Sequence, residues 1–329
     1  MTLGPNPLRQ ALWPLGLLYG AVAAARNLAF DRGWKASFAL PVPVVSIGNL
    51  TVGGTGKTPT VLWLCELARA HGKHPGVLAR GYGRAPGAAL NDEGEMLQRR
   101  LPWLLQEQDP DRVAAGRRLV ERGADFVVLD DGFQHRRLRR EIDVVCVDAQ
   151  RPFGNGQCLP AGDLREGRAG LRRAGLVLLT RAQGLSAEAV DARRERLRRL
   201  ARNDALPVFA CAHAPQDLVR RPGGEVVPLD ALRGRRVVLL TGVARPDSVR
   251  RTADELGAEV VQELRHRDHH RFTAAEVEAA AATARRLDAA LLTTEKDDAR
   301  LDPAGPERLV LRIGLRFLGD APAPGQVGL

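Results

Sequence analysis

The 329-residue sequence predicts an α/β fold in which mostly parallel strands are covered by helices on both faces. Short apolar runs alternate along the chain with helix-like stretches, and most of these runs are continuously apolar. Continuous runs are typical of strands that are buried on both faces of a sheet. The chain is also longer than one domain usually needs, so we expect two α/β lobes.

The expected elements follow this rhythm along most of the chain. Strands are predicted at residues 42–47, 76–79, 126–129, 144–147, 176–179, 237–240, 259–264 and 290–293. Helices are predicted at residues 58–71, 187–202, 248–256 and 273–287. Residues 212–232 interrupt the rhythm, because they contain Pro215, Pro228 and the pair Gly223-Gly224. We expect this segment to be a linker with a hairpin at the two glycines.

The apolar run at residues 11–25 lies between Arg9 and Arg26. It is too short for a membrane span, which takes roughly 20 residues. It is similar to the core of a signal peptide, but Pro14 and Gly16 interrupt it and the helical pattern continues beyond it. Two interpretations stay open: a helix that lies in a membrane interface, and a helix that packs on the protein's own core. The side chains that would face lipid are Trp13, Leu17, Leu18 and Tyr19.

The formal net charge of +10 indicates an anionic partner, such as nucleic acid, an acidic membrane surface or a phosphorylated substrate. Aromatic residues make up 4% of the chain, and neither a stacking motif nor a recognition helix is evident. Nucleic acid is therefore not the expected partner. The 4 cysteines are scattered without a C-x-x-C pair, which favours free thiols in a reducing compartment.

Residues 51–58 read TVGGTGKT and lie between a predicted strand and a predicted helix. Glycines at such a turn let backbone N–H groups face phosphate oxygens, and the following helix adds its positive end. Lys57 is expected to reach the β- and γ-phosphates, and the Thr58 hydroxyl to ligate Mg²⁺. Thr51 stands where the usual G-x-x-x-x-G-K-T pattern has its first glycine. The predicted ATP-binding residues are Thr51, Val52, Gly53, Gly54, Thr55, Gly56, Lys57 and Thr58.

Asp130 and Asp131 follow the predicted strand at residues 126–129. An apolar strand that ends in Asp is the usual partner of a phosphate loop, where its carboxylate holds Mg²⁺ directly or through water. One aspartate could serve the metal and the other the substrate, and the sequence does not divide these roles. Gln134 and His135 come soon after and could orient phosphate or sugar hydroxyl groups.

Several motifs together resemble the tetraacyldisaccharide 4'-kinase family, the lipid A 4'-kinases of Gram-negative bacteria. They are GNLTVGGTGKTP at residues 48–59, Arg80-Gly81-Tyr82, VLDDGFQHRRL at 128–138, LPAGDLRE at 159–166, Asp268-His269-His270 and TTEKD at 293–297. The motifs occur in the family's order over most of the chain. The DDGFQH segment beside this form of phosphate loop is the most specific of them.

The resemblance implies a P-loop NTPase-like α/β/α sandwich and a second, smaller α/β lobe joined to it by a short β linker. It implies transfer of the γ-phosphate of ATP, with Mg²⁺, to the 4'-hydroxyl of a tetraacylated disaccharide 1-phosphate. The expected parts are an interfacial helix region at 1–36, a kinase domain at 37–211, a linker at 212–232 and a C-terminal lobe at 233–329. The expected location is the cytoplasmic face of the bacterial inner membrane, as a peripheral protein that is a monomer.

By motif, the resemblance carries residue roles to this chain. Lys57 and Asp131 fall at catalytic positions, and Thr58, Asp130 and Asp131 at the Mg²⁺ site. The implied substrate-binding residues are Arg80, Gln134, His135 and Glu166.

The family's proposed base is an Asp in a Gly-Asp-Glu segment, paired with the His of an Asp-His element. Here these residues are Asp92 and His269, with Asn91 in place of the Gly and Glu93 as the alternative base. His269 is expected on a short loop before a helix that Thr273 and a glutamate three residues later open as a capping box. His266, His269 and His270 lack a partner at metal-ligand spacing, so no metal site is predicted there.

A membrane-associated switch ATPase is the main alternative. Such chains also contain GGTGKT, but with a Lys just before the two glycines. Val52 occupies that position here and argues against this alternative.

Overall fold

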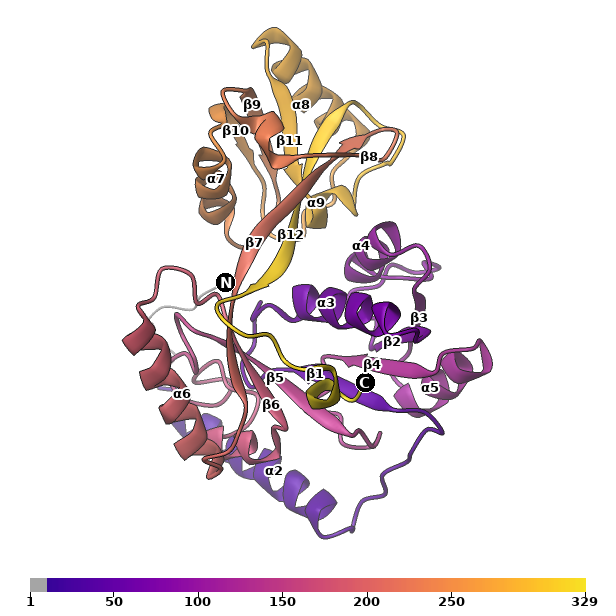
Figure 1. Cartoon of the computed structure of the whole chain (residues 1–329), viewed down its shortest axis with the longest axis vertical. Helices are drawn as coiled ribbons and strands as arrows, with labels where there is room; N and C mark the ends of the chain where they lie inside the picture. The colour runs from indigo at the N-terminus through magenta and orange to yellow at the C-terminus, as the bar shows by residue number, and fades with distance from the viewer. Residues whose placement is uncertain (1–10) are drawn as a thin grey trace. The chain divides into compact units, whose positions relative to one another are not determined.

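The computed structural model describes residues 11–329 and confirms the α/β class (Figure 1). The chain forms two compact units, each with its own buried apolar clusters. Unit 1 contains the chain up to Tyr82 together with Trp103–His213 and Leu315–Leu329. Unit 2 contains Gly83–Pro102 and Ala214–Gly314. Arg9 lies outside the described residues.

The strands of unit 1 follow the order β7-β6-β5-β1-β4-β2-β3, and the neighbouring pairs are parallel. They are β1 (Val44–Gly48), β2 (Pro75–Ala79), β3 (Leu105–Gln108), β4 (Phe126–Asp130), β5 (Ile142–Asp148), β6 (Leu176–Thr180) and the first part of β7 (Val208–Arg221). The central strands are buried along nearly their whole length, which explains their continuous apolar runs. In the β1–β4 pair Ile47 lies opposite Asp130, so both strands end at the same edge of the sheet.

Helices complete unit 1. They are α2 (Trp13–Asp31), α3 (Lys57–Ala70), α5 (Arg112–Glu121) and α6 (Ala187–Ala201), with short 3₁₀ turns at Arg168–Arg173 and Pro324–Val327. Figure 1 shows α3 above the strands and α2 below them. Side-chain caps fix where two of the helices begin: Asp111 accepts from the backbone N–H of Val113, and Ser186 from that of Ala189.

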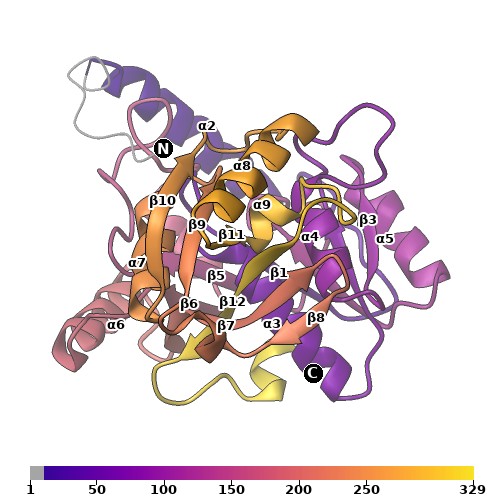
Figure 2. The same ribbon diagram turned by 90° about the horizontal axis from the view of Figure 1, so that it is seen from above.

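Unit 2 contains the strand order β10-β9-β11-β12-β7, and Figure 2 shows β10, β9 and β11 side by side. Its strands are the second part of β7, β8 (Glu225–Val227), β9 (Arg236–Thr241), β10 (Glu259–Arg265), β11 (Ala290–Thr294) and most of β12 (Arg308–Phe317). Its helices are α4 (Asp92–Arg100), α7 (Pro246–Glu255), α8 (Ala274–Arg286) and α9 (Glu295–Asp298), with a 3₁₀ turn at Leu229–Leu232. Thr273 and Glu276 form the predicted capping box at the start of α8.

The segment expected to be a linker is largely strand. β7 runs to Arg221 and pairs with β8 in an antiparallel hairpin, so the predicted turn at Gly223-Gly224 is confirmed. Pro215 does not end the strand, because it lies after the residues that pair with β6 and before those that pair with β8. Sequence reasoning also missed β12, which is 10 residues long, and the shorter or more polar β3, α4, α5 and α9.

Each compact unit combines separate stretches of chain. Residues 83–102 join unit 2 through ion pairs of α4 with α9: Arg100 lies 2.9 Å from Glu295, and Glu93 lies 3.4 Å from Lys296. The C-terminal stretch joins unit 1, where Val327 is buried.

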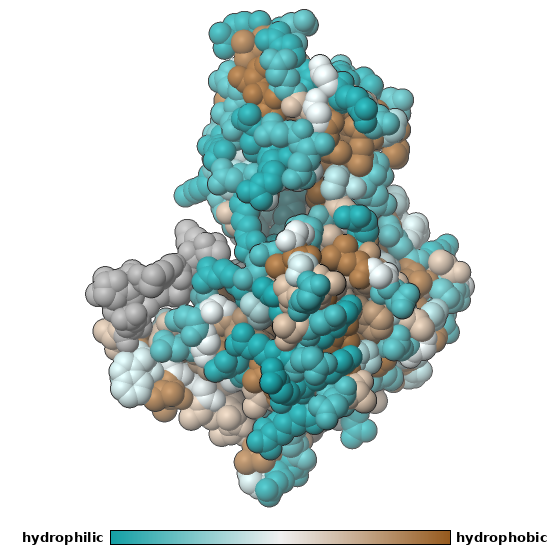
Figure 3. Space-filling view, turned by 60° about the vertical axis from the view of Figure 1, so that its left-hand side comes forward, coloured by the Kyte–Doolittle hydropathy of each residue, from teal (hydrophilic) through white to brown (hydrophobic). Residues whose placement is uncertain are grey.

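Many large apolar side chains of helix α2 are exposed. Gly16 is its one buried residue, and the exposed fractions of Trp13, Leu17, Leu18 and Val22 are 54–62%. Figure 3 shows brown and pale side chains at the lower left of its view. Among residues 11–329, no helix combines the length and apolar character that crossing a bilayer requires.

Candidate active site

The phosphate loop lies between β1 and α3, as predicted. Gly53 and Gly56 have φ angles of 96° and 90°, a region that favours glycine. A Cβ at Gly56 would also lie 2.3 Å from Nε2 of His213, so a larger residue does not fit there. The helix begins directly afterwards at Lys57. The loop and the start of α3 together form an anion-binding turn.

The structure explains why Thr51 is tolerated in place of the usual glycine. Among the described residues, those with positive φ do not include Thr51, so its backbone does not demand glycine. Its carbonyl accepts a 2.7 Å hydrogen bond from Nδ2 of the buried Asn49, and it bridges to Leu164. The next residue, Val52, donates to the carbonyl of Asp163 at 2.7 Å. The segment before Arg165 therefore supports the first half of the loop.

Asp131 lies at the centre of a charged cluster beside the loop. Its Oδ1 is 3.4 Å from Nζ of Lys57, and its Oδ2 accepts a 2.7 Å hydrogen bond from Arg165. Its φ of 50° turns it out of the line of β4, so that it points differently from Asp130. Burial acts to raise the pKa of Asp131, but Lys57 and Arg165 outweigh it and hold that pKa below its ordinary value. The carboxylate is therefore ionised and faces cationic groups.

Arg112, at the start of α5, is a site residue that the sequence did not reveal. Arg112 is 6% exposed, and burial lowers the pKa of its guanidinium. The charges of Asp131 and Asp130 oppose this shift, whereas that of Arg80 adds to it. Arg112 and the predicted Arg80 thus bring further positive charge to the acidic pair. A single Arg after a turn forms no sequence motif, so Arg112 is identified only by its burial in the structure.

Gln134 and Glu166 are joined by a hydrogen bond of 2.9 Å. Gln134 also donates to the carbonyl of Asn49 at 3.0 Å, which ties it to the loop. Glu166 is 3% exposed and accepts two hydrogen bonds of 2.9 Å from Arg173 and one of 2.7 Å from Asn27 of α2. These contacts hold the two side chains in place, and they link α2 to the phosphate loop.

His135 is partly buried among arginines. Burial, followed by the charges of Arg112 and Arg140, lowers its pKa to about 4. The imidazole is therefore neutral near pH 7. It can accept a hydrogen bond from a phosphate or sugar hydroxyl group on one nitrogen and donate one on the other.

The structure brings Asp92 and His269 together within unit 2. Oδ2 of Asp92 lies 3.6 Å from Nδ1 of His269, and both side chains are open to solvent. Asn91 is the N-cap of α4 and accepts from the backbone N–H of Gly94 at 3.0 Å, which gives this departure from Gly a structural use. Glu93, the alternative base, instead lies 3.4 Å from Lys296.

The order of strand, glycine loop and helix, with an acidic strand end beside it, defines the class of P-loop α/β proteins. The family model of tetraacyldisaccharide-1-P 4'-kinase matches residues 8–324. The chain belongs to this family.

Individual relatives agree with this assignment. The chain is 44% identical to the tetraacyldisaccharide 4'-kinase of Anaeromyxobacter sp. (strain K), over 95% of this chain and 92% of the relative. It is 38% identical to that of Syntrophus aciditrophicus (strain SB), over 93% and 87%. The crystal structure of the "apo" form of LpxK from Aquifex aeolicus in complex with ATP has a TM-score of 0.77 and 27% identity, and the match covers 95% of this chain and 96% of that chain.

The low pKa of His135 predicts acid sensitivity. The folded-state pKa of about 4 is below the ordinary value of 6.5, so between these pH values the unfolded chain binds more protons. The free energy of unfolding should therefore fall as the pH is lowered from 6.5 towards 4. In denaturant titrations at several pH values, His135→Asn should reduce this slope, whereas His71→Asn at the exposed end of α3 should not. An equal slope for His135→Asn and the wild type would contradict the assigned environment.

Proposed function

We propose that this chain transfers the γ-phosphate of ATP to the 4'-hydroxyl of tetraacyldisaccharide 1-phosphate, a step of lipid A biosynthesis. The observation that carries the proposal is the cluster of Lys57, Asp131 and Arg165 beside a phosphate loop of this family's form. The switch-ATPase alternative lacks such support, because Val52 stands at its characteristic Lys position.

The charges of the cluster suit phosphoryl transfer, which depends mainly on positioning and on neutralising the phosphate oxygens. Lys57 at the start of α3 would contact the β- and γ-phosphates. Arg165 is held by Asp131 at 2.7 Å, so its guanidinium is oriented before substrate binds. Arg112, buried near the same carboxylates, adds charge where water is partly excluded.

The donor groups of this site fit Mg²⁺, which prefers hard oxygen ligands. Thr58 and Asp130 or Asp131 would hold the ion. The Thr55 hydroxyl is buried in the loop and, within residues 11–329, has no hydrogen-bond partner, so the loop still has a buried oxygen to satisfy. When bound, Mg²⁺ neutralises charge on the β- and γ-phosphate oxygens.

Asp92 is the proposed acceptor of the sugar hydroxyl's proton. The imidazole of His269, with Nδ1 3.6 Å from Oδ2 of Asp92, would position this carboxylate. The engagement of Glu93 with Lys296 favours Asp92 over Glu93 for this role.

Helix α2 is proposed to lie at the cytoplasmic surface of the bacterial inner membrane. Its exposed Trp13, Leu17 and Val22 offer apolar area to the acyl boundary. The net charge of +10 suits both an anionic leaflet and the substrate's 1-phosphate. Asn27 of the same helix donates a hydrogen bond to Glu166. Through this contact, α2 would connect the membrane surface to the residues that support the phosphate loop.

In the decisive experiment, the purified chain is incubated with ATP, Mg²⁺ and tetraacyldisaccharide 1-phosphate. The mass of the lipid product is then measured by mass spectrometry. We expect the addition of one phosphate to the lipid. Lys57→Ala and Asp131→Ala should each lower the rate by at least about 100- to 1,000-fold, since each removes a charge that orders the reacting phosphate. Lys73→Ala, outside the site, is the control. ATP hydrolysis with no lipid phosphate formed would favour the switch ATPase.

The Asp92–His269 pair predicts coupled kinetic effects. Asp92→Asn and His269→Ala should each reduce kcat by about 100- to 10,000-fold with ATP affinity retained, because proton transfer is affected and nucleotide binding is not. The double variant should be little worse than the worse single variant, since the two groups act as a unit. Fully multiplicative effects, or loss of ATP affinity with kcat unchanged, would refute the proton-transfer role.

The exposed face of α2 predicts membrane binding. Leu17→Glu combined with Val22→Glu should reduce flotation with anionic lipid vesicles, because burying charge in the interface is costly. Val226→Glu is the matched control, since Val226 is equally exposed at 59% but lies on β8. Unchanged flotation of the α2 variant would exclude this helix as the membrane contact.

A further inference from the structure

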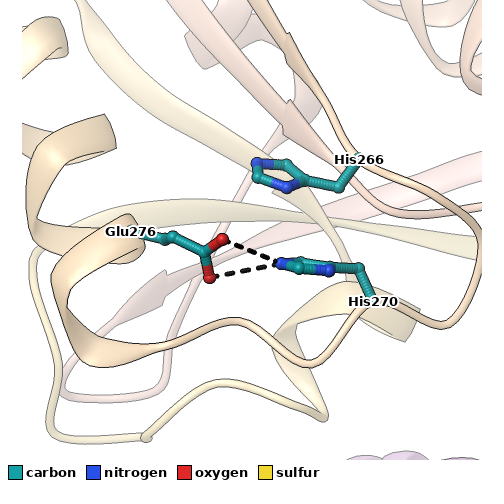
Figure 4. Close-up of side chains that lie close together, drawn as sticks. All are labelled: His266, His270 and Glu276. Atoms are coloured by element: carbon teal, nitrogen blue, oxygen red, sulfur yellow. Dashed lines mark hydrogen bonds and ion pairs between the residues drawn. The ribbon is translucent and has the colours of Figure 1, made fainter.

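Three side chains with metal-binding atoms converge in unit 2. They are His266 and His270, which follow β10, and Glu276 in the first turn of α8 (Figure 4). One donor atom from each lies within 4.8 Å of the other two. The sequence analysis did not predict a site because it found no partner for the histidines, and the fold supplies Glu276 as that partner.

The imidazoles of His266 and His270 lie face to face. Their rings stack with centroids 4.5 Å apart and planes 20° apart, and Figure 4 shows both extending towards Glu276. Nε2 of His270 lies 3.1 and 3.2 Å from the two carboxylate oxygens. For this nitrogen to bind a cation, a neutral imidazole must carry its hydrogen on Nδ1 instead.

The carboxylate is held in position independently of the histidines. Oε2 of Glu276 accepts hydrogen bonds from the backbone N–H and the hydroxyl of Thr273, at 2.7 and 3.0 Å. These are the contacts of the capping box, so the start of α8 orients the carboxylate and leaves Oε1 towards His270. Outer hydrogen bonds of this kind are what fix ligands around protein-bound metals.

The backbone and an aromatic side chain fix the histidines as well. The N–H of His266 donates to the carbonyl of Thr241 at 2.7 Å, which ties the loop to the end of β9. The ring of Phe272 packs edgewise against both imidazoles, with centroid distances of 5.1 and 5.0 Å. All three residues are partly buried. Because their donor atoms already lie within 4.8 Å of one another, small side-chain rotations are enough to bring them around one ion.

We propose that His266, His270 and Glu276 form a site for a divalent transition metal of the Zn²⁺ class. Two imidazoles and one carboxylate are a common donor set for Zn²⁺, with a fourth position left for water. Imidazole donors discriminate against Mg²⁺, so the site is separate in chemistry from the Mg²⁺ site of the phosphate loop. The proposal holds whether or not the chain transfers phosphate.

The test is a titration of the full chain, freed of metal by a chelator, with Co²⁺, whose tetrahedral complexes absorb strongly in the visible range. We expect the tetrahedral spectrum to saturate at one equivalent, to be displaced by Zn²⁺ and to resist excess Mg²⁺. His266→Ala and Glu276→Gln should each weaken Co²⁺ binding by at least about 10- to 100-fold, the loss that follows when even supporting groups are removed. Glu276→Gln retains the capping box, because Gln also serves at that position.

Two controls separate the site from general histidine binding. His269→Ala and His71→Ala should leave Co²⁺ affinity unchanged, since neither residue belongs to the three donors. Circular dichroism of each metal-free variant checks that its fold is intact. A missing tetrahedral spectrum, unaltered affinity in both ligand variants, or loss of binding in His269→Ala would overturn the assignment.

Discussion

The buried carboxylate of Glu166 is the constraint on which the rest of the phosphate site depends. A carboxylate that is 3% exposed must have its charge compensated, and Arg173 does this with two parallel hydrogen bonds. The remaining acceptor capacity binds Gln134 and Asn27, which belong to other parts of unit 1. One negative charge thereby fixes the end of β4, the support of the loop and helix α2 in a single arrangement.

Positive charge in this site is ordered by acidic groups rather than simply accumulated. Asp131 lies between Lys57 and Arg165 and forms an ion pair with each of them. The buried Arg112 approaches the same carboxylates from another helix. A nucleotide that enters such a site meets cations that are already oriented, so little of its binding energy is lost in arranging them.

Contiguous motifs made much of the fold and site predictable from the sequence. The phosphate loop and the acidic strand end are each formed by residues within a few positions of one another. The central strands are buried on both faces, so they show as continuous apolar runs in the sequence. Other features depend on distant partners. Arg112 matters because it is buried, β7 continues through Pro215 because its partners change there, and Glu276 meets His270 through a helix cap. These features depend on tertiary contacts, so they cannot be recognised from a local sequence pattern.

The interleaved course of the chain has a consequence for its synthesis on the ribosome. Helix α4 must await α9, since Arg100 and Glu295 are separated by 195 residues in the sequence. At about 5–20 residues per second, translation keeps α4 without its partner for roughly 10–40 s. Unit 1 likewise acquires Leu315–Leu329 only after the whole of unit 2 has been synthesised. Neither unit can therefore be completed from one continuous stretch of the nascent chain.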